Sequence, residues 1–223
     1  MNDDHGFLRS LLPPEITVSS QRPDTTHASA SLYPVEYDAI AQAVPKRRRE
    51  FAVGRTCARE ALRQLGVAPV AIPVGPHRAP IWPDGYVGSI THCDGFVGAV
   101  AASRATFLGV GVDVERIADL DPGVVGRVCA ADERTALSKV VGARGPLLAF
   151  CAKEAVHKCI FPAWGATLDF LDVEISLGDD NTGGEFRVYP ATPKVKRWDL
   201  GHLRGAYRVG TDVLGAAVWL RAG

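Results

Sequence analysis

Several features that define other classes of protein are missing from this 223-residue sequence. It has no net charge, because 25 lysines and arginines are balanced by 25 aspartates and glutamates, and a general polyanion binder usually carries a basic excess. The most apolar stretches, 96–102 and 213–220, are strand-length, whereas a membrane-spanning helix needs roughly 20 residues. We therefore expect neither a nucleic-acid partner nor a membrane location.

Paired cysteines are also missing. The five cysteines are odd in number and form no CxxC pair, which argues against structural zinc and against a disulfide framework. The first five residues are acidic where a secretory signal would be basic, and no apolar segment follows them. Together these absences predict a reduced, cytoplasmic protein.

What the sequence does contain is enough apolar material for a core. Hydrophobic residues make up 47% and charged residues 22% of the chain, which is the ordinary globular range. At about 150 residues per domain, the length predicts one large or two small domains. The basic residues are uneven, with 19 arginines and only six lysines, so the position of each lysine is informative.

The predicted elements follow one another as a helix, strands, helices and strands. Apolar residues at helical spacing predict a helical segment over 36–66, divided at Pro45. We expect a loose lead-in over 1–35, a proline-rich connection over 67–89 and a loop over 119–128. The other predicted elements are strands at 95–102 and 106–115, helices at 132–141 and 147–160, and strands at 173–177, 185–189, 203–209 and 213–220.

A repeated spacing suggests that a helix-and-sheet unit occurs twice. Phe51 is followed by arginines four and eight residues later, and Phe150 is followed by Glu154 and Lys158 at the same two intervals. A spacing of four places each pair on one face of a helix beside an aromatic residue. The order of elements and this match predict an α+β fold with two similar halves.

Two carboxylates end the predicted strand at 106–115. Asp113 and Glu115 are two residues apart and therefore point to the same side of a strand. Like charges at the edge of a core are unfavourable unless a cation compensates them, and carboxylates together with substrate phosphates suit Mg²⁺. Taken alone, the pair is better explained as a solvated strand end with Asp113 facing Arg116 or a neighbouring arginine.

The helix predicted at 147–160 changes that balance. Glu154 and Lys158 lie on one face of it, and an exposed pair of this kind would be an ordinary surface contact worth a few tenths of a kcal/mol. The flanking residues are apolar, so we expect the helix to be largely packed into the protein. In that setting Glu154 could complete a set of magnesium ligands, and Lys158 could contact phosphate oxygens.

A hydroxyl and an imidazole occur together in the segment 88–93. We expect this segment to be a glycine-flanked turn before a strand, where Thr91 and His92 could hydrogen-bond a phosphate. A catalytic pair of His92 and Cys93 is disfavoured, because adjacent residues on an extended chain point in opposite directions. The alternative is a loop histidine with a purely structural role. The nearby segment 78–83 is interpreted as a rigid turn anchored by Trp82.

A basic segment covers residues 46–63. It holds seven lysines and arginines and two glutamates, a local charge of about +5. Such a segment is typical of a solvated face or a nucleic-acid patch, but it lacks the interleaved aromatic residues of single-strand binders. Guanidinium groups that bind one compact phosphate group are the more economical interpretation.

These pieces, in this order, resemble the Sfp-type 4′-phosphopantetheinyl transferases. The resemblance covers residues 46–160 and is closest to the bacterial subgroup that serves polyketide, nonribosomal-peptide and siderophore synthases. The matching residues are the basic segment 46–62, Arg78-x-Pro80-x-Trp82-Pro83, Gly88-Ser89-x-Thr91-His92, Gly111-x-Asp113-x-Glu115 and Phe150-x-x-Lys153-Glu154-x-x-x-Lys158.

The resemblance implies a fold and a reaction. The fold would be a monomeric pseudo-dimer of two α+β halves, residues 1–106 and 107–223, each with a long helix packed on a small antiparallel sheet and with the active site between them. The reaction would move the phosphopantetheine arm of coenzyme A onto a serine of an apo acyl- or peptidyl-carrier protein and release 3′,5′-ADP.

The resemblance also implies roles for individual residues. Asp113, Glu115 and Glu154 would hold Mg²⁺, for which Mn²⁺ could substitute. Glu154 would take the proton of the carrier serine, directly or through a metal-bound water, and Lys158 would stabilise or protonate the leaving phosphate. The candidates for coenzyme A binding are Arg47 and Arg55 on the 3′-phosphate, and Arg78, Thr91, His92, Lys153 and Lys158. Some relatives have a further lysine before the Arg78 turn, where this chain offers Val74 or His77.

Two other functions remain open from the residues alone. The same carboxylates could serve a different Mg²⁺-dependent phosphoryl or nucleotidyl enzyme. The basic segment 46–63 could instead belong to a non-catalytic nucleic-acid binding module. The sequence does not identify the carrier-docking surface, for which the segment between Glu115 and Arg134 is a hypothesis.

Overall fold

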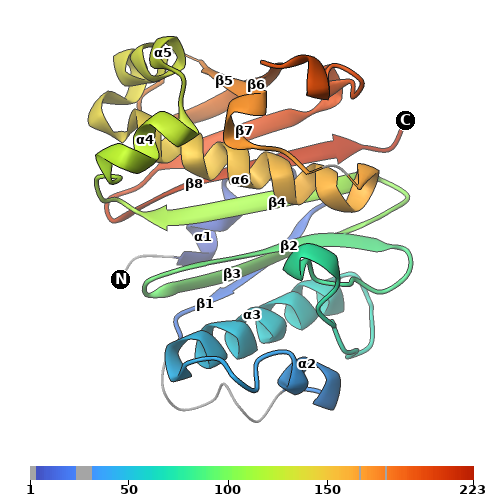
Figure 1. Cartoon of the computed structure of the whole chain (residues 1–223). Helices are drawn as coiled ribbons and strands as arrows, with labels where there is room; N and C mark the ends of the chain where they lie inside the picture. Colours follow the sequence, from blue (N-terminus) through green and yellow to red (C-terminus); the bar gives the residue numbers. More distant parts are fainter. Residues whose placement is uncertain (1–3, 24–31, 166, 179) are drawn as a thin grey trace.

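The computed structural model describes residues 4–23, 32–165, 167–178 and 180–223, and it contains two antiparallel sheets (Figure 1). The first sheet has the order β1-β3-β2 and the second the order β4-β8-β7-β6-β5. The strands are β1 (Thr17–Gln21), β2 (Tyr86–Cys93), β3 (Phe96–Ser103), β4 (Phe107–Arg116), β5 (Val173–Leu177), β6 (Gly183–Pro190), β7 (Arg204–Val209) and β8 (Val213–Arg221). The α-helices are α1 (Asp4–Arg9), α2 (Pro34–Asp38), α3 (Pro45–Gln64), α4 (Pro122–Val128), α5 (Ala131–Val141) and α6 (Gly145–Trp164).

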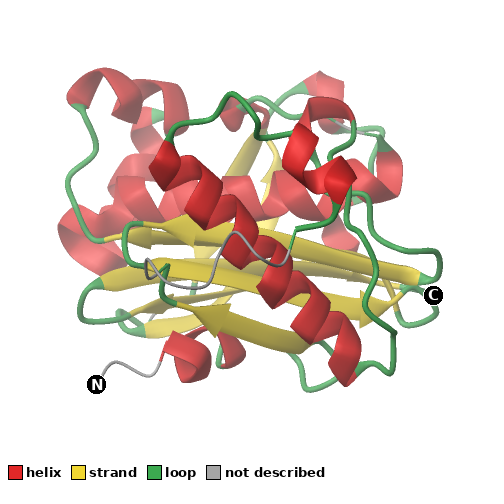
Figure 2. Cartoon of the chain, turned by 90° about the horizontal axis from the view of Figure 1, so that it is seen from below, coloured by secondary structure: helices red, strands yellow, loops and turns green. Residues whose placement is uncertain are grey.

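A long helix packs on each sheet. Pro45 is the first residue of α3, a position where its missing N–H costs nothing. In Figure 2, seen from below, α3 crosses the face of the first sheet, and its small buried residues Cys57, Ala58 and Ala61 pack against Val97 and Ala99 of β3. The helix α6 covers the second sheet (Figure 1). The predicted α+β class is confirmed.

The two sheets meet along β2 and β4, which are edge strands of their own sheets. Side-chain hydroxyls of β2 accept hydrogen bonds from backbone amides of β4. The amide of Val112 donates to Ser89 Oγ at 3.1 Å, and the amide of Val114 donates to Thr91 Oγ1 at 3.0 Å. Unpaired strand edges otherwise invite association with other chains. Here the two edges satisfy each other through side chains, which brings the predicted site residues of both strands together.

Two glycines of β4 let α6 approach closely. A Cβ at Gly111 would lie 1.9 Å from the carbonyl oxygen of Ala155, and one at Gly109 would lie 2.2 Å from that of Cys159. Side chains at these positions would therefore push α6 off the strand. The close approach places the Glu154–Lys158 turn of α6 directly over Asp113.

Three sequence expectations about elements were wrong. The lead-in over 1–35, expected to be extended or loosely packed, includes α1 and the extended strand β1 and is not loosely packed there, because Leu8 and Ile16 are completely buried; its residues 1–3 and 24–31 lie outside the described residues. The segment 88–93 is not a turn but the central and last part of β2. The expected loop at 119–128 includes α4, whose Asp121 side chain caps the helix by accepting from Gly123 N. No helix in the described ranges is both long enough and apolar enough to span a membrane.

Candidate active site

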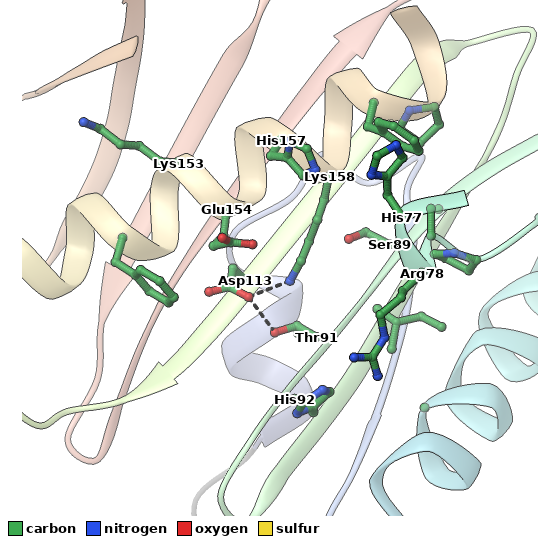
Figure 3. A pocket seen from close by; sticks show the side chains of 18 of the residues that line it. His77, Arg78, Ser89, Thr91, His92, Asp113, Lys153, Glu154, His157 and Lys158 are labelled. Carbon is green, nitrogen blue, oxygen red and sulfur yellow. Dashed lines mark hydrogen bonds and ion pairs between the residues drawn. The ribbon is translucent and has the colours of Figure 1, made fainter. Parts of the chain in front are cut away.

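A cavity of about 500 Å³ lies where the two sheets meet. Its walls come from α3, the loop before β2, β2 itself, β4, α6 and the segment that leads to β5. All the site residues predicted from the sequence line it. Figure 3 shows Glu154, His157 and Lys158 on α6 facing the side chains of β2 and of the loop that carries His77 and Arg78.

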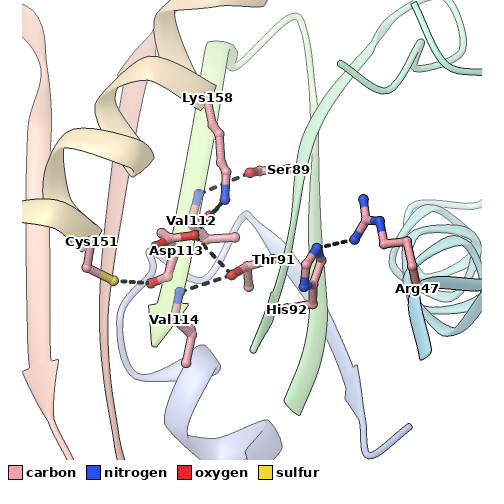
Figure 4. Close-up of polar contacts among 9 residues, drawn as sticks. All are labelled: Arg47, Ser89, Thr91, His92, Val112, Asp113, Val114, Cys151 and Lys158. Atoms are coloured by element: carbon pink, nitrogen blue, oxygen red, sulfur yellow. Dashed lines mark hydrogen bonds and ion pairs between the residues drawn. The ribbon is translucent and has the colours of Figure 1, made fainter. Parts of the chain in front are cut away.

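Asp113 is at the centre of this cavity. Its Oδ1 accepts a hydrogen bond from Lys158 Nζ at 2.6 Å and one from Thr91 Oγ1 at 3.3 Å (Figure 4). Its Oδ2 is buried and has no hydrogen-bond partner among the described residues. An unsatisfied buried carboxylate oxygen is costly, so this atom is a position where a cation would be favourable.

Glu115 and Glu154 add two further carboxyl groups to the cavity lining. Burial and the neighbouring Asp113 raise the pKa of Glu115 to about 7. Burial also raises the pKa of Glu154, helped by Asp113 and opposed by Lys158. Raised carboxyl pKa values mean that ionising these groups together is unfavourable in the absence of a compensating positive charge. A bound cation would stabilise the ionised carboxylates and lower their pKa values.

The carboxylates do not surround a common metal position in this structure. Within the described ranges, no three His, Cys, Asp or Glu side chains converge as a metal-binding group, and Lys158 supplies the positive charge beside Asp113. The oxygen-only donor set and the unpartnered Asp113 Oδ2 nevertheless fit a hard divalent cation such as Mg²⁺.

Lys158 reaches the carboxylates from one turn beyond Glu154. Its Nζ also donates to the backbone oxygen of Val112 at 3.2 Å. Burial favours loss of its proton, but Asp113 and then Glu154 outweigh burial, and the pKa of Lys158 is raised. The side chain is therefore a permanent cation at neutral pH, suited to neutralising an anionic ligand.

Basic groups gather on the opposite wall. Arg47 of α3 hydrogen-bonds His92 Nε2 (Figure 4), and the carboxylate of Glu50 lies 3.6 Å from His92 Nδ1 and 3.9 Å from Arg47. Burial and then the nearby Arg78 lower the pKa of Arg47, and burial and then Arg47 lower the pKa of His92. The lowered pKa values show that the cationic forms of these groups are disfavoured while no anion is bound, so an anion such as a phosphate would be favourable here.

Arg55 lies deeper, one helical turn further along α3 from Phe51. Its guanidinium sits 4.2 Å from the centre of the Phe51 ring, and its Nε has no hydrogen-bond partner in the part of the chain that the structure describes. Burial lowers its pKa to about 10. Arg55 therefore has unused hydrogen-bonding capacity inside the cavity.

Two predicted binding residues have their polar groups occupied within the protein. The hydroxyl of Thr91 is 1% exposed and is used by Val114 N and Asp113. The ammonium of Lys153 donates to Glu133 Oε2 at 2.7 Å and to the Val128 oxygen at 2.8 Å, and Figure 3 shows it pointing away from Asp113. We therefore interpret both as residues that position the site.

The bridging position of Glu50 and the backbone conformation of His77 and Arg78 were not predicted from the sequence, although Arg78 itself was a predicted binding residue. In the sequence, Glu50 entered only the net charge of the basic segment. In the structure its carboxylate lies between Arg47 and His92. His77 and Arg78 have φ angles of 53° and 64°, and among the described residues they are the only non-glycine residues in the left-handed region. Such conformations concentrate at functional sites, but no sequence signal marks them here.

The geometry thus brings together carboxylates and a lysine on one wall, which are suited to a cation and an anion, and arginines and a histidine on the other, which are suited to phosphates. Comparison with protein families agrees. Residues 35–102 match the 4′-phosphopantetheinyl transferase N-terminal domain, and residues 109–212 match the 4′-phosphopantetheinyl transferase superfamily.

Individual relatives extend this match over almost the whole chain. The 4′-phosphopantetheinyl transferase Svp of Streptomyces mobaraensis is 37% identical over 97% of this chain and 90% of its own length. PptT of Mycobacterium tuberculosis is 43% identical over 84% of this chain and 85% of its own length. The enterobactin synthase component D of Salmonella typhi is 37% identical over 59% of this chain and 56% of its own length.

The chain therefore belongs to the 4′-phosphopantetheinyl transferase superfamily, and the predicted Sfp-type family is confirmed. It is a transferase of the holo-[acyl-carrier-protein] synthase type, an enzyme that attaches phosphopantetheine to carrier proteins.

Proposed function

We propose that the cavity between the two halves binds coenzyme A and transfers its phosphopantetheine arm to a serine of an apo acyl- or peptidyl-carrier protein. The observation that supports this most is the division of charge across the cavity, with Arg47 and His92 on one wall and Asp113, Glu154 and Lys158 on the other. Coenzyme A carries a 3′-phosphate, for which the basic wall is suited, and a pyrophosphate, which a cation held by the carboxylates and Lys158 would neutralise.

Arg47, Arg55 and Arg78 would hold the 3′-phosphate and the nucleotide, with His92 beside them. Guanidinium groups fork onto phosphate oxygens through paired N–H donors. The contact between Arg47 and His92 keeps both side chains at the cavity wall before a ligand arrives. This arrangement reduces the side-chain ordering that binding would otherwise require.

The transfer forms a bond between the carrier serine oxygen and the β-phosphorus, and breaks the bond between that phosphorus and the oxygen of the leaving 3′,5′-ADP. Glu154, whose pKa is raised by burial, is the proposed base for the serine proton. Lys158 would neutralise or protonate the departing phosphate oxygen. Such displacements depend mainly on positioning and charge stabilisation.

Asp113, Glu115 and Glu154 would hold Mg²⁺, with Mn²⁺ as a substitute. When bound, the ion would supply positive charge to the pyrophosphate oxygens. The unpartnered Asp113 Oδ2 and the raised pKa values of Glu115 and Glu154 support this assignment. Lys158 would then exchange part of its contact with Asp113 for a contact with phosphate.

The molecular organisation is part of the same proposal. We place the division into halves between residues 106 and 107, where the chain passes from the sheet of β3 to the sheet of β4. We also propose that the protein is a monomer, since one chain supplies both walls of the cavity. Its proposed location is the cytoplasm. Polyketide, nonribosomal-peptide and siderophore synthases would provide the carrier proteins.

The test is the mass of an intact carrier protein after incubation with the enzyme, coenzyme A and Mg²⁺. We expect a gain of one phosphopantetheine group and a stoichiometric release of 3′,5′-ADP. No gain on any acyl- or peptidyl-carrier protein would contradict the proposal. Turnover of a nucleotide without a carrier protein would instead favour the alternative Mg²⁺-dependent phosphoryl or nucleotidyl enzyme.

A further inference from the structure

His157 lines the cavity but has no part in the transfer described above. It lies on α6 next to Lys158, and its ring stacks on Phe161 with 5.8 Å between ring centres and an interplanar angle of 27°. His77, from the loop before β2, meets the same Phe161 ring edge-on at 5.2 Å. The imidazole of His157 therefore stacks on an aromatic ring of its own helix, and His77 contacts that same ring from the loop before β2.

One nitrogen of this ring lacks a partner. His157 Nδ1 is buried, and no donor or acceptor among the described residues hydrogen-bonds it. Nearly all buried polar atoms in proteins are paired, and an unpaired one costs about 1–3 kcal/mol. An atom in this condition on the wall of a ligand cavity is expected to find its partner in the ligand.

The surroundings indicate which part of a ligand this would be. On α6, Phe150 lies two turns before His157 and Phe161 one turn after it, and the segment leading to β5 adds Leu168 and Phe170 to the cavity wall. Phe150 and Phe170 stack at 5.4 Å. A largely aromatic and aliphatic lining with an unpaired polar atom suits an uncharged chain that carries a hydrogen-bonding group.

Coenzyme A has one such portion. Its phosphates are the charged groups for which the arginine wall is suited, whereas the pantetheine arm is uncharged and contains two amides. We propose that His157 Nδ1 forms a hydrogen bond with an amide of the pantetheine arm, and that His157 thereby distinguishes coenzyme A from nucleotides that lack the arm. This inference rests on the proposed function, because it concerns the same cavity.

The experiment compares the dissociation constants of coenzyme A and of 3′,5′-ADP, which keeps the charged part and lacks the arm. His157→Phe retains the stacking on Phe161 and removes both nitrogens. We expect it to weaken coenzyme A binding about tenfold, as the loss of one buried hydrogen bond implies, and to leave 3′,5′-ADP binding unchanged. His202→Phe, at an exposed position paired with Asp199, is the matched control and should change neither constant.

Two more variants keep the inference testable if His157→Phe folds poorly. The amide of His157→Asn reaches the position of Nδ1 and should retain most of the affinity for coenzyme A. His157→Gln places its amide near the position of Nε2 and should behave like the Phe variant. Melting temperatures measured alongside would separate loss of folding from loss of the contact.

The outcomes distinguish the two proposals. Equal weakening of coenzyme A and 3′,5′-ADP, or unchanged affinity for coenzyme A in His157→Phe, would overturn the role of His157 while the wild-type enzyme still modifies carrier proteins. If Asn and Gln lose affinity equally, the assignment to Nδ1 is wrong. Failure of the wild-type protein to bind coenzyme A would instead contradict the proposed function itself.

Discussion

At the scale of single residues, Asp113 connects the walls of the cavity. It is on β4, it forms an ion pair with Lys158 of α6 at 2.6 Å, and it accepts a hydrogen bond from the hydroxyl of Thr91 of β2 at 3.3 Å. These contacts use only Oδ1, which leaves Oδ2 available to a cation. Asp113 is therefore both the electrostatic partner of Lys158 and the central proposed metal ligand.

Asp113→Asn should abolish magnesium-dependent transfer while the protein still folds. The amide has nearly the same shape, but it cannot compensate a divalent cation, and we expect a loss of at least about a hundredfold in kcat, the usual effect of removing one electrostatic stabiliser. Carrier mass after a fixed time measures the loss, and Glu174→Gln on the exposed face of β5 is the control. Full activity in Asp113→Asn would show that the metal assignment is wrong.

Glu115 should make the stability of the metal-free protein depend on pH. Its pKa is about 7 in the folded protein against a reference of 4.5, so its protonated form favours folding. This contribution is complete below pH 4.5 and is lost as the pH rises through about 7, and because the carboxyl is partly exposed, solvent screening reduces its size.

The measurement is the melting temperature between pH 5 and 8 without metal. We expect a decline that Glu115→Gln flattens, because the amide does not titrate. Added Mg²⁺ should raise the melting temperature more at pH 8 than at pH 5.5, since the ligands must be deprotonated. A wild-type profile as flat as that of the variant would contradict the assignment.

At the scale of secondary-structure elements, the spacing between β4 and α6 sets the site. Gly111→Ala should force them apart, because its Cβ would lie 1.9 Å from the Ala155 oxygen and 2.6 Å from the Cys159 nitrogen. We expect a loss of about 3 kcal/mol or more in unfolding free energy, as for severe overpacking, and lower activity. Gly178→Ala, where a Cβ would meet only the Glu185 oxygen at an ordinary 3.7 Å, should leave both unchanged in a denaturant titration and an activity assay.

A buried ion pair fixes α6 from its other side. Lys153 and Glu133 are 3% and 2% exposed, and the second oxygen of Glu133 accepts the amide of Ile175 in β5. Lys153→Met should cost about 3–5 kcal/mol because it leaves Glu133 unpaired. The double variant Lys153→Met with Glu133→Gln, which removes the charge and keeps an oxygen for the amide of Ile175, should recover much of that stability in thermal unfolding.

The same double variant distinguishes the two interpretations of Lys153. If the residue only positions α6, the KM for coenzyme A should stay within about twofold of wild type. A stable double variant with a strongly raised KM would show that Lys153 binds coenzyme A, as the sequence first suggested.

The elements that were predicted correctly have either a continuous run of apolar residues or apolar residues at helical spacing. The strands β3, β4 and β8 are almost continuously apolar, and α6 buries residues along its length. The strand β1 was missed because Thr17–Gln21 is short and mostly polar, and its stability depends on pairing with β3. The glycine, serine and threonine of 88–91 favoured a turn, whereas in the fold Ser89 and Thr91 receive amides of β4.

The site shows the same limit. Spacing within one element was enough to predict Asp113, Glu115, Glu154 and Lys158 as candidates. The bridging role of Glu50, the backbone of His77 and the unpartnered nitrogen of His157 depend on contacts between distant segments. No local pattern encodes those contacts.

At the scale of the whole molecule, the neutral total charge conceals two opposed local fields. Basic residues of α3 and of the loop before β2 form one wall of the cavity, and acidic residues of β4 and α6 form the other. The absence of net charge excludes a broad basic face. It is consistent with a cleft that concentrates charge of each sign on one ligand and one cation.

The central claim is that this cleft binds coenzyme A and a divalent cation together. The most direct test is a crystal structure of the protein with both. We expect the ion bound by carboxylate oxygens of Asp113, Glu115 and Glu154 at about 2.1 Å, the 3′-phosphate beside Arg47 and Arg55, and the pantetheine arm along His157. Coenzyme A bound outside the cleft, or a metal ion that contacts none of the three carboxylates, would contradict the account.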